Sequence, residues 1–345
     1  MLEISRGSIS KYCAQSICLI ASFVPFEHTR EFIRQILKID VSQTAIEHLS
    51  HRIGLKMYHN VWEKGRMPYK LSCSSKHVNK LYIQMDGAMV PLCGDKKVEH
   101  RENKLAVLYT DRDVVQLKQQ NGEDKFKIKR KKYVSSLAEG VEKFRKMLHA
   151  VSIEKGAKIA KEIVILGDGA PWISKIKEDY YPEATFILDW YHATEKLWVT
   201  ARELFRDNTQ KCREWVEPLE SLLWDGKVDQ LIKEITKQAM KRKKNQTPLF
   251  SLRTYYMNNK DNMNYPEYRR KGYNIGSGAI ESANKYIVAQ RLKLSGMQWT
   301  SSHANAIIHL RSKYFENNWD KFWEDMKMSD YYNHNLVEKY RKEAA

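Results

Sequence analysis

Two aspartates and one glutamate stand where carboxylates can build a site. Asp86 and Asp168 each follow an apolar run typical of a buried strand, and each precedes a glycine. In sheets with parallel strands, ligand sites tend to form at the carboxyl ends of strands, and glycine permits a tight exit and close approach of a substrate. Glu281 lies in the first turn of an expected helix. Taken singly, each Asp-Gly pair is equally typical of an ordinary turn.

Carboxylates of this kind point to metal chemistry. Three of them within a few ångström repel one another unless a cation neutralises them. Oxygen-only ligands suit Mg²⁺ or Mn²⁺, and two such ions about 3.5–4 Å apart can clamp the attacking and leaving oxygens of a phosphodiester. We therefore predict a two-metal site formed by Asp86, Asp168 and Glu281.

The charge of the chain points to a polyanionic substrate. Its 345 residues hold 59 Lys and Arg against 42 Asp and Glu, a net charge of +17. Such an excess attracts polyanions, and nucleic acid is the first candidate. A basic protein that is merely soluble is the alternative.

The cysteines and the hydropathy bear on the compartment. Five scattered cysteines without a Cys-x-x-Cys pair favour a reducing compartment and argue against a zinc ribbon. The apolar run 12–26 keeps a helical repeat and is interpreted as a core helix. No stretch reaches the ~20 apolar residues of a membrane span, so we expect no membrane partner.

An α/β sheet must position the two aspartates. Residues 79–191 have the order strand, strand, strand, helix, strand, helix, strand, which predicts a mixed five-stranded sheet flanked by helices. The expected strands are 81–85, 105–109, a very basic segment at 125–133, 163–166 and 185–188. The first three are expected to be antiparallel. Helices are expected over 137–150 and from Pro171.

The N-terminal residues 1–78 are expected to be helical. Helices over 26–39 and 42–53, the second ended by Gly54, suggest a helix-turn-helix that binds DNA; a plain helical hairpin fits equally well. The second helix offers as plausible base readers only Gln43, His48, His51 and Arg52. Glu47 on the same surface would repel phosphate.

Residues 192–272 carry no strand signal and are expected to form a helical insertion. The basic run 241–244 within it is either a solvated face or a phosphate contact. Residues 273–327 are expected to complete the core, followed by a charged tail at 328–345.

The stretch 276–299 is expected to deliver Glu281. Two glycines around Ser277 predict a tight turn into a helix. The apolar stripe of that helix comprises Ile280, Ala283, Ile287 and Leu294. Downstream, Lys285, Arg291 and Lys293 are predicted to hold a phosphate backbone, and Trp299 either stacks on a displaced base or belongs to the core. By itself, the stretch also fits an ordinary amphipathic helix with a capping glutamate.

The motifs around these residues resemble a known family. Tyr-Ile-Gln-Met-Asp86-Gly-Ala-Met-Val, Ile-Leu-Gly-Asp168-Gly-Ala-Pro-Trp-Ile, Leu-Asp189-Trp-Tyr-His192 and the stretch 276–299 resemble the DDE transposases of bacterial insertion sequences. The resemblance is greater to the ISKra-type group than to the ISLre-type group and covers roughly residues 15–325. Relatives often carry a longer N-terminal region, so the resemblance leaves open whether this chain is shortened and its element still mobile.

The resemblance implies an RNase H-like catalytic domain interrupted by the helical insertion, with Asp86, Asp168 and Glu281 as metal ligands. It implies nicking and strand transfer at the ends of an insertion sequence, on double-stranded DNA, by a homo-oligomer in the bacterial cytoplasm at the nucleoid. Asp189 and His192 match a motif at the start of the insertion, with either an auxiliary role or a structural capping role. Two alternatives are a transposase-derived DNA-binding protein without catalysis and a nuclease of the same fold without strand transfer.

Overall fold

The computed structural model describes residues 9–73, 77–94, 97–118, 124–206, 208–242 and 246–327. The predicted charged tail and part of the basic run at 241–244 lie outside these residues. The chain divides into two compact units. Unit 1 comprises Met1–Leu81, Asp86–Lys161 and Ala279–Ala345, and unit 2 comprises Tyr82–Met85 and Glu162–Gly278.

A five-stranded sheet has the order β5-β2-β1-β6-β7. Its strands are β1 (Val78–Cys93), β2 (Val98–Thr110), β5 (Lys132–Leu137), β6 (Ala160–Gly167) and β7 (Thr185–Leu188). Strands β2 and β5 are antiparallel, whereas β6 and β7 are parallel, so the sheet is mixed. Helix α4 (Gly140–Glu154) packs on β2 and β5, and α5 (Pro171–Tyr180) contacts β6 through Ile173. The mixed five-stranded sheet flanked by helices is therefore confirmed.

The predicted strand at 125–133 is wrong in its bounds. Its basic alternation belongs to β4 (Asp124–Ile128), which pairs with β3 (Val114–Lys118) in a separate two-stranded sheet. The strand that joins the main sheet is β5, whose residues from Tyr133 on are buried. Residues Ala138 and Gly140 have φ of 61° and 78°, so the chain turns there and α4 begins later than the predicted residue 137.

Three helices open unit 1, as expected: α1 (Lys11–Phe23), α2 (Phe26–Leu37) and α3 (Gln43–Arg66). Helix α1 is a core helix, with Ile17 and Ala21 fully buried. Within the described ranges, no helix is long and apolar enough to cross a membrane. The unit also contains α13 (Ser301–Phe315), α14 (Trp319–Glu324) and the short 3-10 turns η1 (Pro68–Lys70) and η2 (Asp111–Asp113).

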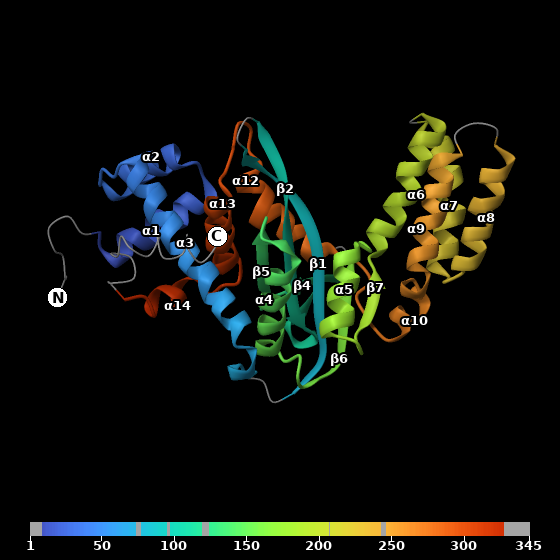
Figure 1. The fold of residues 1–345 in the computed structure, drawn as a ribbon, viewed down its shortest axis with the longest axis horizontal. Coiled ribbons are helices and arrows are strands. Elements are labelled where there is room, and N and C mark those ends of the chain that lie inside the picture. Colours follow the sequence, from blue (N-terminus) through green and yellow to red (C-terminus); the bar gives the residue numbers. More distant parts are fainter. Residues whose placement is uncertain are drawn as a thin grey trace. The chain divides into compact units, whose positions relative to one another are not determined.

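The predicted helix-turn-helix is not confirmed. Helix α3 does not end at Gly54 but runs 24 residues to Arg66, alongside α13 (Figure 1). A Cβ on Gly54 would lie 2.3 Å from the carbonyl oxygen of Ala306, so this glycine permits a close helix crossing. The proposed reader His51 is 5% exposed, and its Nε2 lies 2.7 Å from Ser302 Oγ.

The described residues between β7 and Gly278 contain helices and no strand. These are α6 (Trp190–Phe205), α7 (Thr209–Trp224), α8 (Val228–Lys241), α9 (Thr247–Asn259), η3 (Lys260–Asn262) and α10 (Tyr265–Arg270). Helices α6 to α9 pack on one another within unit 2 (Figure 1). Their shared core includes the buried Leu197, Ile235 and Tyr256.

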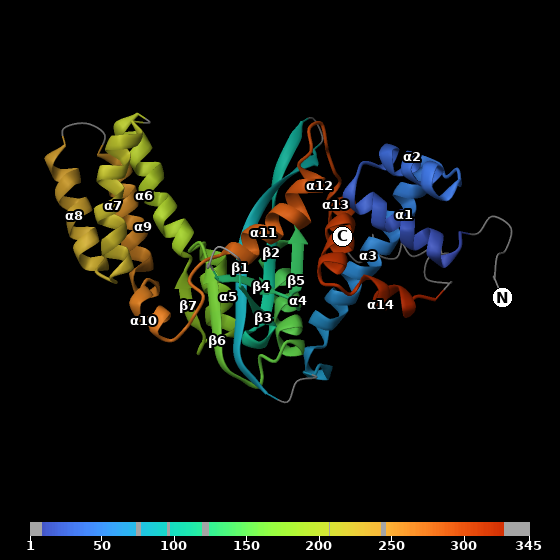
Figure 2. The same cartoon turned by 180° about the vertical axis from the view of Figure 1, so that it is seen from behind.

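The helix expected to carry Glu281 is divided into three pieces. It begins as α11 (Gly278–Ala283), continues as the π-helix η4 (Asn284–Ala289) and ends as α12 (Gln290–Leu292), as Figure 2 shows for α11 and α12. Because the helix ends at Leu292, Leu294 lies outside the apolar stripe predicted for it and is 38% exposed. Ile280, Ala283 and Ile287 are buried as expected.

Candidate active site

Asp86 lies in the middle of β1, which continues to Cys93, and not at the end of a strand as predicted. Gly87 does not end the strand, although its residue type suits a turn. A Cβ on Gly87 would instead lie 2.3 Å from Glu102 Oε1, so the glycine makes room for that neighbouring side chain. The half-buried Asp86 carboxylate is oriented by two hydrogen bonds. Its Oδ1 accepts from the Gly87 amide at 2.7 Å, and its Oδ2 accepts from Asn284 Nδ2 at 2.6 Å.

Asn284 connects the helix of Glu281 to Asp86 within unit 1. Residues three apart on a helix share a face, so Glu281 and Asn284 lie on the same side of it. Glu281 is exposed in the first turn of α11. The Asn284 Oδ1 atom is buried and has no hydrogen-bond partner among the described residues. Asn284 also begins the π-helix, a feature found frequently at functional sites.

Asp168 follows β6 directly, as the sequence predicts. Its Oδ1 accepts a hydrogen bond from the Ala170 amide at 2.9 Å, which shapes the turn. Gly169 has φ of 85°, and a Cβ there would lie 2.7 Å from Asn259 Oδ1. The Tyr255 hydroxyl donates to the Asp168 carbonyl at 3.3 Å. Burial raises the pKa of Tyr255, and the negative charge of Asp168 adds to the rise, so this hydroxyl keeps its proton.

The residues that precede the two aspartates are neighbours within unit 2. A Cβ on Gly167 would lie 3.5 Å from the carbonyl oxygen of Met85. Met85 and Gly167 are each followed directly by an aspartate, Asp86 and Asp168. The chain therefore approaches both aspartates along adjacent strands.

A polar hollow of about 430 Å³ adjoins the turn after Asp168. It is lined by Gly169, Pro171, Ser174, Lys175, Glu178, Tyr255, Asn258, Asn259 and Asn262. Its amide and hydroxyl groups can donate and accept hydrogen bonds with a polar ligand beside the turn.

The glycine turn that leads to α11 is held within unit 2. The Trp190 amide donates to the Ile275 carbonyl at 2.9 Å, and Gln84 Nε2 donates to the Gly276 carbonyl at 3.4 Å. A Cβ on Gly276 would lie 2.8 Å from the Tyr191 ring, so a larger residue would require this exposed ring to move. The turn predicted from Gly276 and Gly278 thus depends on close packing against the start of α6.

Asp189 and His192 form a capping pair at the start of α6. Asp189 is fully buried, and its Oδ2 accepts from the His192 amide at 2.9 Å and from His192 Nδ1 at 2.7 Å. This is the N-cap geometry of the structural alternative. Asp189 Oδ1 is buried without a hydrogen-bond partner among the described residues. The auxiliary role of the pair stays a prediction.

Two of the predicted DNA contacts lie in the core. Arg291 is 1% exposed; its Nε donates to the Ala21 carbonyl at 3.1 Å, and its guanidinium lies 4.8 Å from the Trp299 ring centre. Burial and the nearby Arg311 lower its pKa to about 10. Trp299 is 5% exposed and donates from Nε1 to the Leu292 carbonyl at 3.2 Å, so it takes the core alternative. The interpretation of Arg291 as a phosphate contact is therefore corrected.

The remaining predicted contacts, Lys285 and Lys293, are both exposed. Across the described ranges, no group of three or more His, Cys, Asp and Glu side chains is gathered as a metal site. Asn284 and Tyr255 each form a hydrogen bond to one of the aspartates and are not among the residues predicted from the sequence. Asn284 could have been found from its spacing three residues after Glu281, whereas nothing in the sequence connects Tyr255 with Asp168.

Comparisons with known proteins give one strong and one weak result. No curated protein matches the chain. Among solved structures, the Drosophila P element transposase strand transfer complex is similar, with 9% identity over 98% of this chain and 87% of that chain and a TM-score of 0.30. The profile of the uncharacterised protein family UPF0236 matches residues 15–327, and the chain belongs to this family.

Proposed function

We propose that this protein is a DNA transposase of the insertion-sequence kind, which nicks and joins DNA with Asp86, Asp168 and Glu281 as its catalytic carboxylates. The hydrogen bond from Asn284 Nδ2 to Asp86 Oδ2, at 2.6 Å, carries the proposal because it ties the helix of Glu281 to the strand of Asp86. The adjacency of Met85 and Gly167 supports the place of Asp168 in the same set. In this proposal the mixed sheet is RNase H-like, and helices α6 to α10 are its insertion.

The donor atoms fit hard divalent cations. Carboxylate oxygens and amide carbonyl oxygens are ligands that Mg²⁺ accepts. The buried Asn284 Oδ1, unpaired among the described residues, lies beside such a carboxylate on Asp86. Two Mg²⁺ or Mn²⁺ ions would supply the positive charge that stabilises the attacking and leaving oxygens of an in-line displacement at phosphorus.

The chain itself supplies position. The Gly87 amide and Asn284 hold the Asp86 carboxylate in one orientation, and the Ala170 amide holds Asp168. In the first step, water attacks a phosphodiester, the P–O3′ bond breaks and a 3′-hydroxyl is freed. In the second, that 3′-hydroxyl attacks a phosphodiester of the target, and the target's own 3′-oxygen leaves. Lys285 and Lys293 hold phosphates of the bound strand.

The central test is removal of each carboxylate charge at nearly constant shape. Asp86→Asn, Asp168→Asn and Glu281→Gln should each abolish nicking of a supercoiled plasmid in Mg²⁺ or Mn²⁺ while DNA binding in EDTA persists. The plasmid carries the DNA that flanks the gene, so that the proper ends are present. Glu203→Gln, which removes an exposed carboxylate of α6 outside the set, is the matched control. If all three variants still nick the plasmid, the assignment of the site is wrong.

Asn284 provides a graded version of the same test. Its replacement by Ala leaves the carboxylates in place but removes the donor to Asp86 Oδ2. Loss of a group that orients a metal ligand typically costs 10–100-fold in activity, so Asn284→Ala should slow nicking by roughly that factor. A joined product between a labelled transposon end and a target plasmid distinguishes a transposase from a nuclease, which would yield cleaved ends only.

A further inference from the structure

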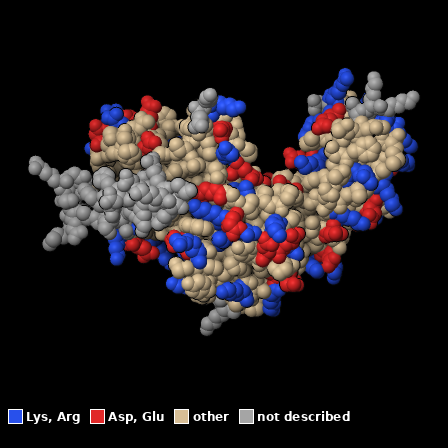
Figure 3. Space-filling model, in the orientation of Figure 1, with Lys and Arg blue, Asp and Glu red and all other residues tan. Residues whose placement is uncertain are grey.

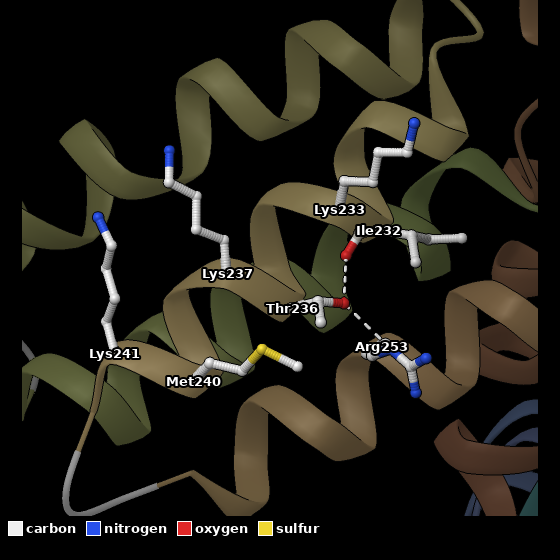
Figure 4. A pocket seen from close by; sticks show the side chains of 7 residues that line it. All are labelled: Ile232, Lys233, Thr236, Lys237, Met240, Lys241 and Arg253. Carbon is white, nitrogen blue, oxygen red and sulfur yellow. Dashed lines mark hydrogen bonds between the residues drawn. The ribbon is translucent and has the colours of Figure 1, made fainter.

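A basic groove lies between helices α8 and α9 of unit 2. It has a volume of about 530 Å³ and is lined by Ile232, Lys233, Thr236, Lys237, Met240, Lys241 and Arg253, which Figure 4 shows. Four of the seven lining residues are cations and none is acidic. Figure 3 shows Lys and Arg side chains gathered at the α8 edge of this helical bundle. We call this the α8 groove.

The three lysines of the α8 groove form one stripe. Lys233, Lys237 and Lys241 are four residues apart, so each step advances about 6 Å along the helix and turns about 40° around it. All three are exposed, and Figure 4 shows them on the same side of α8, with Lys233 inclined away from Lys237 and Lys241. The opposite face of α8 is the one that packs in the bundle, through Leu231 and Ile235.

Neither acidic side chain of α8 forms an ion pair with the lysines of this stripe. Asp229 Oδ1 pairs with Lys260 at 2.7 Å, and Glu234 Oε1 accepts from Gln238 Nε2 at 2.9 Å. Among the described residues, no acidic side chain forms an ion pair with the three lysines of the groove. Their positive charge is therefore available to an anion from solution.

Arg253 adds a fixed cation from the other wall. Its Nε donates to Thr236 Oγ1 at 3.0 Å, and Thr236 Oγ1 donates to the Ile232 carbonyl at 2.7 Å. Figure 4 shows the terminal guanidinium nitrogens turned away from Thr236. One hydrogen bond thus orders the side chain and leaves the planar donors that suit a phosphate.

We propose that the α8 groove binds the phosphodiester backbone of double-stranded DNA, through residues other than the catalytic carboxylates. The choice of DNA among polyanions rests on the proposed function. Lys233 and Lys241 are about 12 Å apart along the helix, and phosphates of one DNA strand recur about every 3.4 Å of duplex axis, so the stripe spans roughly three or four of them. A partner of this chemistry supplies the negative charge that the groove itself lacks.

The test is the salt dependence of binding to a fluorescent 30-base-pair duplex in EDTA, measured by anisotropy on the full chain. Each phosphate contact contributes about −0.9 to the slope of log K against log salt. The triple variant Lys233→Gln/Lys237→Gln/Lys241→Gln should therefore have a slope that is less steep by about 2.7. The matched control, Arg202→Gln/Lys211→Gln/Arg213→Gln, removes three exposed cations from α6 and α7. We expect its slope to stay at the parent value.

An unchanged slope in the lysine variant, or an equal fall in the control variant, would overturn the proposal. So would a lysine variant that loses binding to a labelled RNA of the same length, measured in the same way, but still binds the DNA duplex like the parent. Arg253→Lys keeps the positive charge but loses the planar donors, so this substitution should also weaken binding to the duplex. The proposed catalytic function is judged separately. If the carboxylate variants still nick DNA while the lysine variant shows the expected smaller salt dependence, the α8 groove binds DNA and the catalytic assignment is wrong.

Discussion

Helices α12 and α8 both carry basic residues, but they place them in opposite environments. Arg291 of α12 is enclosed in unit 1 by the Ala21 carbonyl and the ring of Trp299. Lys233 and Lys237 of α8 are exposed in unit 2 and lie in a groove. Charge type alone does not separate the two cases.

The position relative to the apolar stripe does separate them. Arg291 follows the buried Ile287 by four residues, so it falls on the core face of its helix. Lys237 follows the buried Ile235 by two residues and therefore points the other way. Burial of a guanidinium requires partners, which the Ala21 carbonyl supplies through a hydrogen bond. A basic residue should thus be assigned to DNA only after its register on the helix has been examined.

The largest expected effect that this contrast predicts is on stability. Arg291→Ala leaves a cavity and a buried carbonyl without a donor, so it should lower the free energy of unfolding by roughly 2–4 kcal/mol. The exposed counterpart Lys237→Ala should change it by less than about 0.5 kcal/mol. Urea unfolding followed by circular dichroism measures both. Should Arg291→Ala prevent folding, Arg291→Met keeps most of the volume and gives a smaller loss to compare. An Arg291 variant with parental stability but weakened DNA binding would reverse the contrast.

The sequence predicted the elements better than their edges. Alternation and apolar runs located four of the five sheet strands, because buried strands must be apolar whatever their partners. It could not show that β1 continues past Asp86, since Gly87 is equally suited to a turn and to the space that Glu102 needs. The same ambiguity affects Gly54, because a glycine that suits a helix end equally suits the close helix crossing found here.

For the candidate carboxylates, the sequence predicted the elements that carry two of them but not the groups that hold them. Asp168 and Glu281 lie on the elements expected for them. The hydrogen bond between Asn284 and Asp86 joins residues that are 198 positions apart, so no helical periodicity encodes it. Of the α8 groove, the sequence indicated only the basic run near the end of the helix. The groove itself could not be predicted, because it forms only where Arg253 of α9 lies beside the lysines of α8.

The next effect concerns pH and another buried ionisable group of unit 1. Burial lowers the pKa of His309 to about 4, and its Nδ1 lies 2.9 Å from the Asn305 carbonyl. The positive charge of Lys313 and the nearby His59 lower this pKa further, whereas the negative charge of Glu316 and the hydrogen bond to the Asn305 carbonyl raise it. The unfolded chain binds a proton near pH 6.5 that the folded chain refuses until about pH 4, so stability falls as pH drops through this window.

The size of this loss is roughly 3 kcal/mol by pH 4. Urea midpoints between pH 7 and 4.5 should therefore fall steeply for the parent, and His309→Gln should flatten part of that slope. His48→Gln, at an exposed position on α3, is the control and should leave it unchanged. An identical slope in parent and His309→Gln would show that the acid sensitivity arises elsewhere.

The smallest expected effect on the fold tests the two exposed cations that flank Arg291. Lys285→Gln/Lys293→Gln should leave the free energy of unfolding within about 0.5 kcal/mol of the parent, because neither side chain is buried. If both lysines hold phosphates, the slope of log K against log salt should fall by about 1.8 in the same anisotropy experiment.

Combination with the three α8 substitutions then separates two modes of binding. Two surfaces that hold one duplex together give slope losses that add, because each releases its own counterions in a single binding event. Two surfaces that bind separate duplexes instead leave the slope of the tighter one unaffected by changes to the other. An unchanged slope in Lys285→Gln/Lys293→Gln would show that these two lysines, like Arg291, do not hold phosphates. DNA binding would then be assigned to the lysines of α8.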